Sequence, residues 1–340
     1  MTPLRTSLHP SCHRHLLVAA LLLAIVPAAA RTPSASPLPL PASGVIGVQD
    51  AQLSPAFWLA RTLQPAQVLL TPQQIEARNA RLLRDDPSMH DLTALPASLT
   101  GAQVRTWIEQ SASPPAKPLW DEAGNPIPQA TLDAIVANRA LSVLPANQAT
   151  RYGMAVHRTA LRTFPTTLRV FSSQGETDID RFQESALFPG DAVVITQSSA
   201  DGQWFFVLSQ RYAAWAEASA IAEGERNTVL GYASRAPFRI ITGAKPRTLF
   251  TREQPRLSEL QLDMGTRIPL ADVAVNKPVN GQHPYTSWIL DLPMRDDAGR
   301  LAFAPALLQK NTDSAAAALP LTRANVIRQA FKFLGERYGW

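Results

Sequence analysis

Cysteine is almost absent from this 340-residue sequence, and the only one, Cys12, lies near the amino terminus. Residues 31–340 contain no thiol, which excludes disulfides, thiolate metal sites and a cysteine nucleophile from that part of the chain. Histidine is scarce there as well, with only His90, His157 and His283. The stability of this part must therefore come from packed apolar cores.

Long apolar runs are also absent. The longest, Leu16–Val26, is too short to span a bilayer comfortably. It follows Arg5 and Arg14 and precedes a group of small residues, which is the order of a secretory signal. We therefore predict a signal peptide over residues 1–30 and a periplasmic or secreted location without a membrane anchor. Because Cys12 precedes the apolar run, we do not expect lipidation.

Neither sign of charge dominates the sequence. Removal of residues 1–30 would leave 30 basic side chains against 27 acidic ones. The basic residues are scattered among the acids, so we do not expect nucleic acid as a partner. The three remaining histidines have no partner at metal-ligand spacing, and we predict neither a metal nor a cofactor.

The chain after the predicted signal divides by composition. Residues 31–44 form a proline-rich leader, and residues 45–150 show helical periodicity. Helix starts are predicted at Thr71, at Thr100 and near Pro128 from capping residues and from proline at the first turn. The apolar stripes of these helices are Ile75, Leu82 and Leu83, then Val104, Trp107 and Ile108, then Leu132, Ile135 and Val136.

Short β-rich runs replace the helical periods after Arg151. DAVVITQ and WFFVLSQ flank Asp201-Gly202, which predicts a hairpin. With a strand over 212–217 they predict a small half-open barrel over residues 151–220. A second β domain is predicted over 221–312, with strand candidates LGYAS, PFRIITG, TRIPL and SWILDL and a hairpin at PMRDDAGRLAF. The predicted fold is mainly β, with two SH3-like barrels, a helical amino-terminal segment and a carboxyl-terminal helix.

The segment YGMAVHRTALRTFPTTLRVFSS, followed by PGDAV, ADGQWFFV and WAE, resembles the first bacterial SH3 (SH3b1-type) domain of NlpC/P60 cell-wall hydrolases. SPAFWLARTLQPAQVLLTPQQIEARNARL and LWDEAGNPIP resemble the stabilising domain that precedes it. GTRIPL and LPMRDDAGRLAF resemble the second SH3b domain. The final ANVIRQAFKFLGERYGW resembles the opening helix of the peptidase domain. The resemblance implies a stabilising domain at 45–150, SH3b domains at 151–220 and 221–312, and the first helix of a truncated peptidase domain at 320–340.

The resemblance implies an exported cell-wall protein that acts on peptidoglycan stem peptides. The family hydrolyses the bond after γ-D-glutamate with a paired cysteine and histidine, and this sequence matches neither residue. We therefore assign no catalytic residue. The chain as given is interpreted as the non-catalytic recognition and stabilising part of a murein γ-D-glutamyl-diamino-acid endopeptidase. A stand-alone SH3b murein-binding or adaptor protein is the alternative, and whether the protein is an enzyme stays open.

Two residues are candidates for stem-peptide binding. Arg162, in the loop after the first barrel strand, would suit bidentate capture of a carboxylate; the alternatives are a solvated arginine or an internal salt bridge. Trp204 follows the hairpin turn, where it would stack on sugar or peptide; the alternative is a core position. His157 is interpreted as a surface or packing residue. The acidic pairs Asp85-Asp86, Asp121-Glu122 and Asp296-Asp297 lie in turn-like sequence, so a glycosidase is not expected.

The carboxyl-terminal helix should begin after Thr322 and end at Gly335. Its apolar stripe consists of Val326, Ile327, Ala330, Phe331 and Leu334. In the complete family architecture the rest of the peptidase domain would cover this stripe. Here the helix is expected to lean only on the SH3b units, and the stripe to stay substantially exposed.

Overall fold

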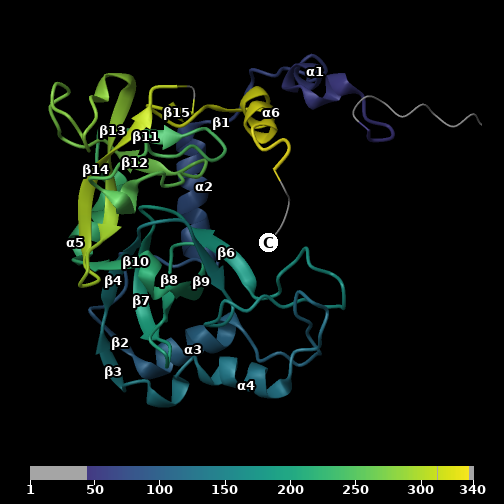
Figure 1. Ribbon diagram of the computed structural model, residues 1–340, viewed down its shortest axis with the longest axis vertical. Helices are drawn as coiled ribbons and strands as arrows, with labels where there is room; N and C mark the ends of the chain where they lie inside the picture. Colours follow the sequence, from purple (N-terminus) through teal and green to yellow (C-terminus); the bar gives the residue numbers. More distant parts are fainter. Residues whose placement is uncertain (1–43, 312, 337–340) are drawn as a thin grey trace, which may run out of the picture. The chain divides into compact units, whose positions relative to one another are not determined.

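The structure is a computed structural model that describes residues 44–311 and 313–336 (Figure 1). Contacts divide the chain into residues 1–49 and 50–340, and the elements below belong to the second unit. The predicted signal peptide, and the predicted leader up to residue 43, lie outside the described residues. Within the described ranges, no helix combines the length and the apolar character that a membrane span requires.

The helices of the amino-terminal region start at the predicted caps. Helix α2 (Pro72–Asp85) follows Thr71, whose hydroxyl accepts the Gln74 N–H while the Gln74 side chain accepts the Thr71 N–H. The Thr100 hydroxyl caps α3 (Gly101–Ser111), and α4 (Gln129–Ala137) follows Pro128. The short elements of this region are η1 (Asp50–Leu53), α1 (Pro55–Leu59), β1 (Val68–Leu70), β2 (Ser98–Thr100), η2 (Leu141–Val143) and β3 (Asn147–Ala149).

A seven-stranded antiparallel sheet forms the centre of the unit, in the order β10-β4-β7-β8-β9-β5-β6. Its strands are β4 (Arg151–Ala155), β5 (Thr159–Arg162), β6 (Gln183–Leu187), β7 (Ala192–Ser198), β8 (Trp204–Leu208), β9 (Ala213–Glu217) and β10 (Ile221–Gly224). The β7–β8 hairpin is confirmed, and Gly202 supplies a positive φ of 72° at its turn. The end strands β10 and β6 do not pair with each other, so the predicted barrel is an open sheet.

Apolar side chains cover both faces of this sheet. On one face, helix α3 contributes Val104 and Ile108 to a core with Phe206 and Trp215, whose rings meet edge to face at 5.4 Å. On the other face, Leu161, Val193, Ile195, Val207 and Ile221 form a second cluster. The alternation of these residues along the strands explains how one sheet serves two cores.

The next segment forms a second β unit. Its strands are β11 (Phe238–Ile241), β12 (Arg267–Pro269), β13 (Ser287–Arg295), β14 (Leu301–Gln309) and β15 (Ser314–Ala315), with the short helices η5 (Pro255–Leu257) and η6 (Pro284–Thr286). Strands β13 and β14 form the predicted hairpin. A cluster around Ile241, Leu262 and Leu290 makes its core. The fold is therefore mainly β, but this unit consists of a three-stranded sheet and a hairpin rather than one closed barrel.

The strand predicted at LGYAS is wrong, because residues 230–234 close helix α5 (Arg226–Gly231) and form η4 (Tyr232–Ser234). The Tyr232 ring is buried and stacks on Phe303 at 5.3 Å, and its hydroxyl donates to the Asp291 carbonyl. Contact with a hairpin more than fifty residues away thus decides the local conformation.

The carboxyl-terminal helix α6 (Arg323–Phe331) begins as predicted, with the Thr322 hydroxyl accepting the Asn325 N–H. The helix ends at Phe331, before the predicted end at Gly335. Val326 in the helix and Leu334 just beyond it are 49% and 56% exposed, which confirms the expected exposure of the stripe at these positions. The helix does not lean on the β units alone. Strand β16 (Leu321–Thr322) pairs with β1, and α6 packs beside α1, as Figure 1 shows. This contact with the amino-terminal segment corrects our expectation.

Candidate functional site

Arg162 lies at the end of β5, where it holds the long loop that follows. Its side chain is buried; Nη1 donates to Asp180 Oδ2 at 2.8 Å and Nη2 donates to the Leu168 carbonyl at 2.6 Å. The other carboxylate oxygen of Asp180 accepts the N–H groups of Val170 and Phe182. The structure thus places Arg162 in an internal ion pair that fixes residues 163–182, and a ligand contact from it stays a prediction.

Trp204 opens β8 and is 5% exposed. Most of its ring packs in the core with Phe206, and its backbone N–H donates to the Ser199 hydroxyl. The remaining edge lines a depression of about 810 Å³ between α4, the Pro165–Thr167 segment and the β7–β8 turn. Trp204 is thus both a core residue and part of a concave surface, and its contact with a ligand also stays a prediction.

Asn138, directly after α4, connects the walls of this first depression. Its amide nitrogen donates to the Pro165 carbonyl and to Asp201 Oδ2, both at 3.0 Å. Its side-chain oxygen accepts the Asp201 N–H, and its carbonyl accepts the Ala200 N–H. One side chain therefore fixes the helix, the loop and the hairpin turn relative to one another. Our sequence analysis did not identify Asn138, because its partners are distant in the chain.

Two further depressions continue from the first. The second, of about 400 Å³, shares Thr167, Gln203 and Trp204 with the first and adds Gly202, Glu217, Ala218, Ser219 and Arg295. The third, of about 380 Å³, shares Ser219 and Arg295 with the second and reaches Val156, His157, Arg256 and residues 293–297. These three adjoining depressions are called the groove below. It begins at α4 and ends at the β13–β14 turn.

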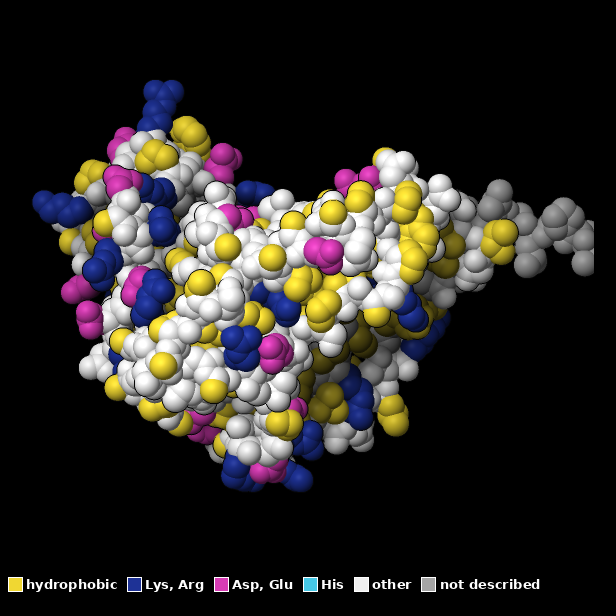
Figure 2. Space-filling view, turned by 90° about the horizontal axis from the view of Figure 1, so that it is seen from below, with side chains coloured by type: hydrophobic (Ala, Val, Ile, Leu, Met, Phe, Trp, Pro, Cys, Tyr) yellow, Lys and Arg dark blue, Asp and Glu magenta, His cyan; other side chains and the backbone are white. Residues whose placement is uncertain are grey.

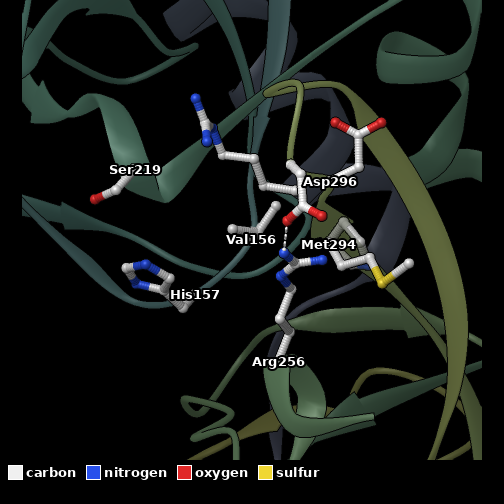
Figure 3. Close-up of a pocket in the computed structure, with 9 residues that line it drawn as sticks. Val156, His157, Ser219, Arg256, Met294 and Asp296 are labelled. Carbon is white, nitrogen blue, oxygen red and sulfur yellow. Dashed lines mark hydrogen bonds and ion pairs between the residues drawn. The ribbon is translucent and has the colours of Figure 1, made fainter.

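The third depression lies between the two β units (Figure 3). His157 and Ser219 come from the seven-stranded unit, and His157 Nδ1 lies 3.0 Å from the Arg158 carbonyl. Arg256, Met294 and Asp296 come from the second unit. Asp296 Oδ1 accepts the N–H groups of Ala298 and Arg300, so this carboxylate shapes the turn, as expected for an aspartate in such sequence.

The other two histidines lie outside the groove. His90 meets the Trp107 ring edge to face at 6.5 Å, and burial lowers the pKa of its imidazole. His283 Nδ1 accepts the Tyr285 N–H and caps η6. Nowhere in residues 44–311 and 313–336 do three or more His, Cys, Asp or Glu side chains gather in a way that would hold a metal ion.

Charges of both signs are interspersed on the face shown in Figure 2. The groove itself follows the same pattern, since its lining includes Arg256 and Arg295 as well as Asp201, Glu217 and Asp297. Arg256 is neutralised by an ion pair with Asp297. Such a surface favours ligands that carry charges of both signs over a uniformly charged polymer.

Comparison with known proteins agrees with this geometry. A family model of the SH3 domain (SH3b1 type) matches residues 169–217, which include β6 to β9 and the hairpin turn of the groove. The seven-stranded unit therefore contains an SH3 domain of the SH3b1 type. No curated protein matches the chain.

A solved structure extends the likeness beyond this domain. An NlpC/P60 endopeptidase of Photobacterium damselae subsp. piscicida aligns over 81% of this chain with a TM-score of 0.60 and 16% identity. This chain spans 59% of the length of that protein. An NlpC/P60 family protein of Bacillus cereus aligns over 48% of this chain and 55% of its own, at 17% identity and a TM-score of 0.33. The predicted resemblance to NlpC/P60 proteins with SH3b domains is thus confirmed for the fold.

Proposed function

We propose that this chain is a cell-wall module that binds peptidoglycan stem peptides in the groove. It is the recognition and stabilising part of a murein γ-D-glutamyl-diamino-acid endopeptidase and works in the periplasm or outside the cell. The observation that carries this proposal is the SH3b1 match over residues 169–217. The matched segment supplies Ala200–Trp204 and Glu217, which line the first two depressions.

The proposed domain boundaries follow the apolar clusters. Residues 45–150 stabilise the SH3 unit, because α3 and α4 bury their stripes against it and against its long loop. Residues 151–220 form the SH3b1 unit. Residues 221–312 form a second SH3b-type unit, which has its own core around Leu290. The structural likeness to an NlpC/P60 endopeptidase over 81% of the chain supports this division.

The chain as given is proposed to be non-catalytic. Thiol peptidase chemistry needs a thiolate with an adjacent base, and residues 31–340 contain no cysteine. In the described part of the chain, the ring nitrogens of His157 and His283 contact only backbone groups. His90 packs on Trp107 instead. These contacts support structural roles for all three histidines.

A stand-alone murein-binding or adaptor protein is the second candidate. The pairing of β16 with β1 favours this candidate, because it packs the α6 segment against the amino-terminal region of the same chain. Arg323 also donates to the Gln67 side chain, and the Ala324 N–H donates to the Pro65 carbonyl. A large loss of thermal stability on removal of the segment would favour this candidate.

Co-sedimentation with isolated murein sacculi tests the proposal. Purified residues 31–340 should pellet with sacculi, and Thr167→Trp should weaken pelleting, because Thr167 is exposed and lines the first two depressions. Gln174→Trp is the matched control, because Gln174 is an exposed residue of the same loop outside the groove. Failure of the unmodified protein to pellet at low salt would overturn the proposal.

A further inference from the structure

Arg295 lies where the second and third depressions of the groove meet. It ends β13, so the second β unit contributes it to a surface that is otherwise largely formed by the SH3 unit. Its Nε donates to the Ile221 carbonyl of β10 at 3.1 Å, which fixes the half-buried side chain across the junction. Within the described ranges, neither terminal nitrogen of this guanidinium has a hydrogen-bond or ion-pair partner.

The neighbouring arginines differ from Arg295 in this respect. Arg256 pairs with Asp297, and Arg158 pairs with Asp263. Arg151 forms a two-bond contact with the Glu223 carboxylate, which is the geometry that a guanidinium fork prefers. Arg295 is held in place by Nε and keeps its two other nitrogens available. An oriented fork of this kind is suited to a carboxylate from a ligand.

Glu217 provides the opposite charge in the same depression. It ends β9, is half-buried and lines the second depression together with Arg295. Its carboxylate makes no ion pair or hydrogen bond with any residue of the described part of the chain. A volume of about 400 Å³ lies within the range of small-ligand sites, roughly 300 to 1,000 Å³. The depression therefore presents one unpaired cation and one unpaired anion at ligand scale.

We propose that Arg295 and Glu217 bind a short zwitterionic peptide, with a ligand carboxylate on the Arg295 guanidinium and a ligand ammonium on the Glu217 carboxylate. This inference rests on the proposed function and deepens it: the part of the stem peptide bound here is the diamino acid, which bears both groups. The two β units form this site jointly. Trp204 lines both this second depression and the first one.

Calorimetric titration of the soluble tripeptide L-Ala-γ-D-Glu-meso-diaminopimelate into purified residues 31–340 tests the site. Charge-assisted hydrogen bonds contribute about 1.5 to 3 kcal/mol, so Arg295→Gln should weaken binding roughly tenfold to hundredfold. Amidation of the peptide carboxylates should weaken binding to the unmodified protein similarly, but should add little to the effect of Arg295→Gln. Glu217→Gln should likewise weaken binding, and acetylation of the peptide's side-chain amine should weaken binding to the unmodified protein but add little to the effect of Glu217→Gln.

Arg300→Gln is the matched control, because it removes one positive charge from the same hairpin at an exposed position outside the groove. It should leave tripeptide binding unchanged. Arg295→Lys keeps the charge but loses the fork, and should bind less tightly than the unmodified protein at an unchanged melting temperature. Equal tripeptide affinity for Arg295→Gln and the unmodified protein, or no binding to the unmodified protein at millimolar peptide, would overturn the inference.

The sacculus experiment separates this inference from the proposed function. Suppose that the protein pellets with sacculi but Arg295→Gln binds the tripeptide as tightly as the unmodified protein. This result would refute the Arg295 site and leave the cell-wall function in place. Arg295-dependent tripeptide binding without pelleting would support the site and refute the cell-wall function. The two results are independent, because the first measures the assembled polymer and the second measures a single peptide.

Discussion

The buried ion pair of the SH3 loop provides the sharpest stability prediction. Asp180 is 2% exposed and accepts hydrogen bonds from Arg162 Nη1 at 2.8 Å, from the Val170 N–H at 3.2 Å and from the Phe182 N–H at 3.0 Å. Asp180→Ala would leave a buried guanidinium and two backbone donors without an acceptor. Removal of one partner of a buried ion pair costs about 3 to 5 kcal/mol, and we expect a loss of this size.

Urea unfolding followed by tryptophan fluorescence measures this loss, because Trp204 and Trp215 lie in the core that the loop adjoins. Glu122→Ala is the matched control. Glu122 pairs with Arg169 on the same loop, but both side chains are substantially exposed, at 59% and 42%. An exposed pair contributes roughly 0 to 1 kcal/mol, so this variant should remain close to the unmodified protein.

A paired replacement tests the physical reason. Arg162→Met combined with Asp180→Leu removes both charges and fills similar volume. It should recover the part of the loss that comes from the unpaired guanidinium, but not the part that comes from the Val170 and Phe182 N–H groups. Equal, small losses for Asp180→Ala and Glu122→Ala would refute the reasoning, because they would show that contacts other than the carboxylate hold residues 163–182. Asp180→Ala should also weaken sacculus binding, because residues 163–182 would lose their fixed conformation and Pro165–Thr167 form one wall of the first depression.

Two other predictions concern pH and the carboxyl-terminal segment. Burial lowers the pKa of His90 below its ordinary 6.5, so the unfolded chain binds the proton more readily. The free energy of unfolding should therefore fall as the pH drops below about 6.5, and His90→Gln should flatten that dependence in urea titrations at several pH values. Deletion of residues 320–340 should improve solubility, speed amide exchange at Val68–Leu70 and leave the melting temperature unchanged; a fall of several degrees would show that α6 is integral.

The helix starts were predictable because their chemistry is local. Thr71, Thr100 and Thr322 each accept an N–H from the residue three positions ahead, so the donor and the acceptor are visible together in the sequence. The Asp201-Gly202 turn is equally local, since a positive φ at glycine fits a hairpin turn. These signals determine where elements begin and end, without reference to what the elements pack against.

Tertiary contacts explain what local patterns missed. Residues 230–234 were predicted as a strand. In the structure Tyr232 packs in a core against Phe303, and the backbone at residues 232–234 forms a short 3-10 helix. The pairing of β1 with β16 joins segments at opposite ends of the described chain. Nothing within either two- or three-residue strand indicates its partner, because such short elements carry almost no register information.

Arg162 and Arg295 show why the candidate site was only partly predictable. Arg162 is buried and Arg295 is half-buried, and each is held in place by a hydrogen bond to a backbone carbonyl, of Leu168 and Ile221 respectively. The chain also supplies Arg162 with a carboxylate, Asp180, eighteen residues away, and the pair becomes part of the framework.

For Arg295 the chain supplies no such carboxylate among the described residues. The nearest acids of its own turn are already engaged, Asp296 by backbone N–H groups and Asp297 by Arg256. A buried or half-buried charge is costly unless it is paired. The same residue type is therefore structural where the fold provides its counter-ion and a binding residue where a ligand must provide it. That distinction depends on the positions of the carboxylates in space, which is why the sequence singled out Arg162 and passed over Arg295.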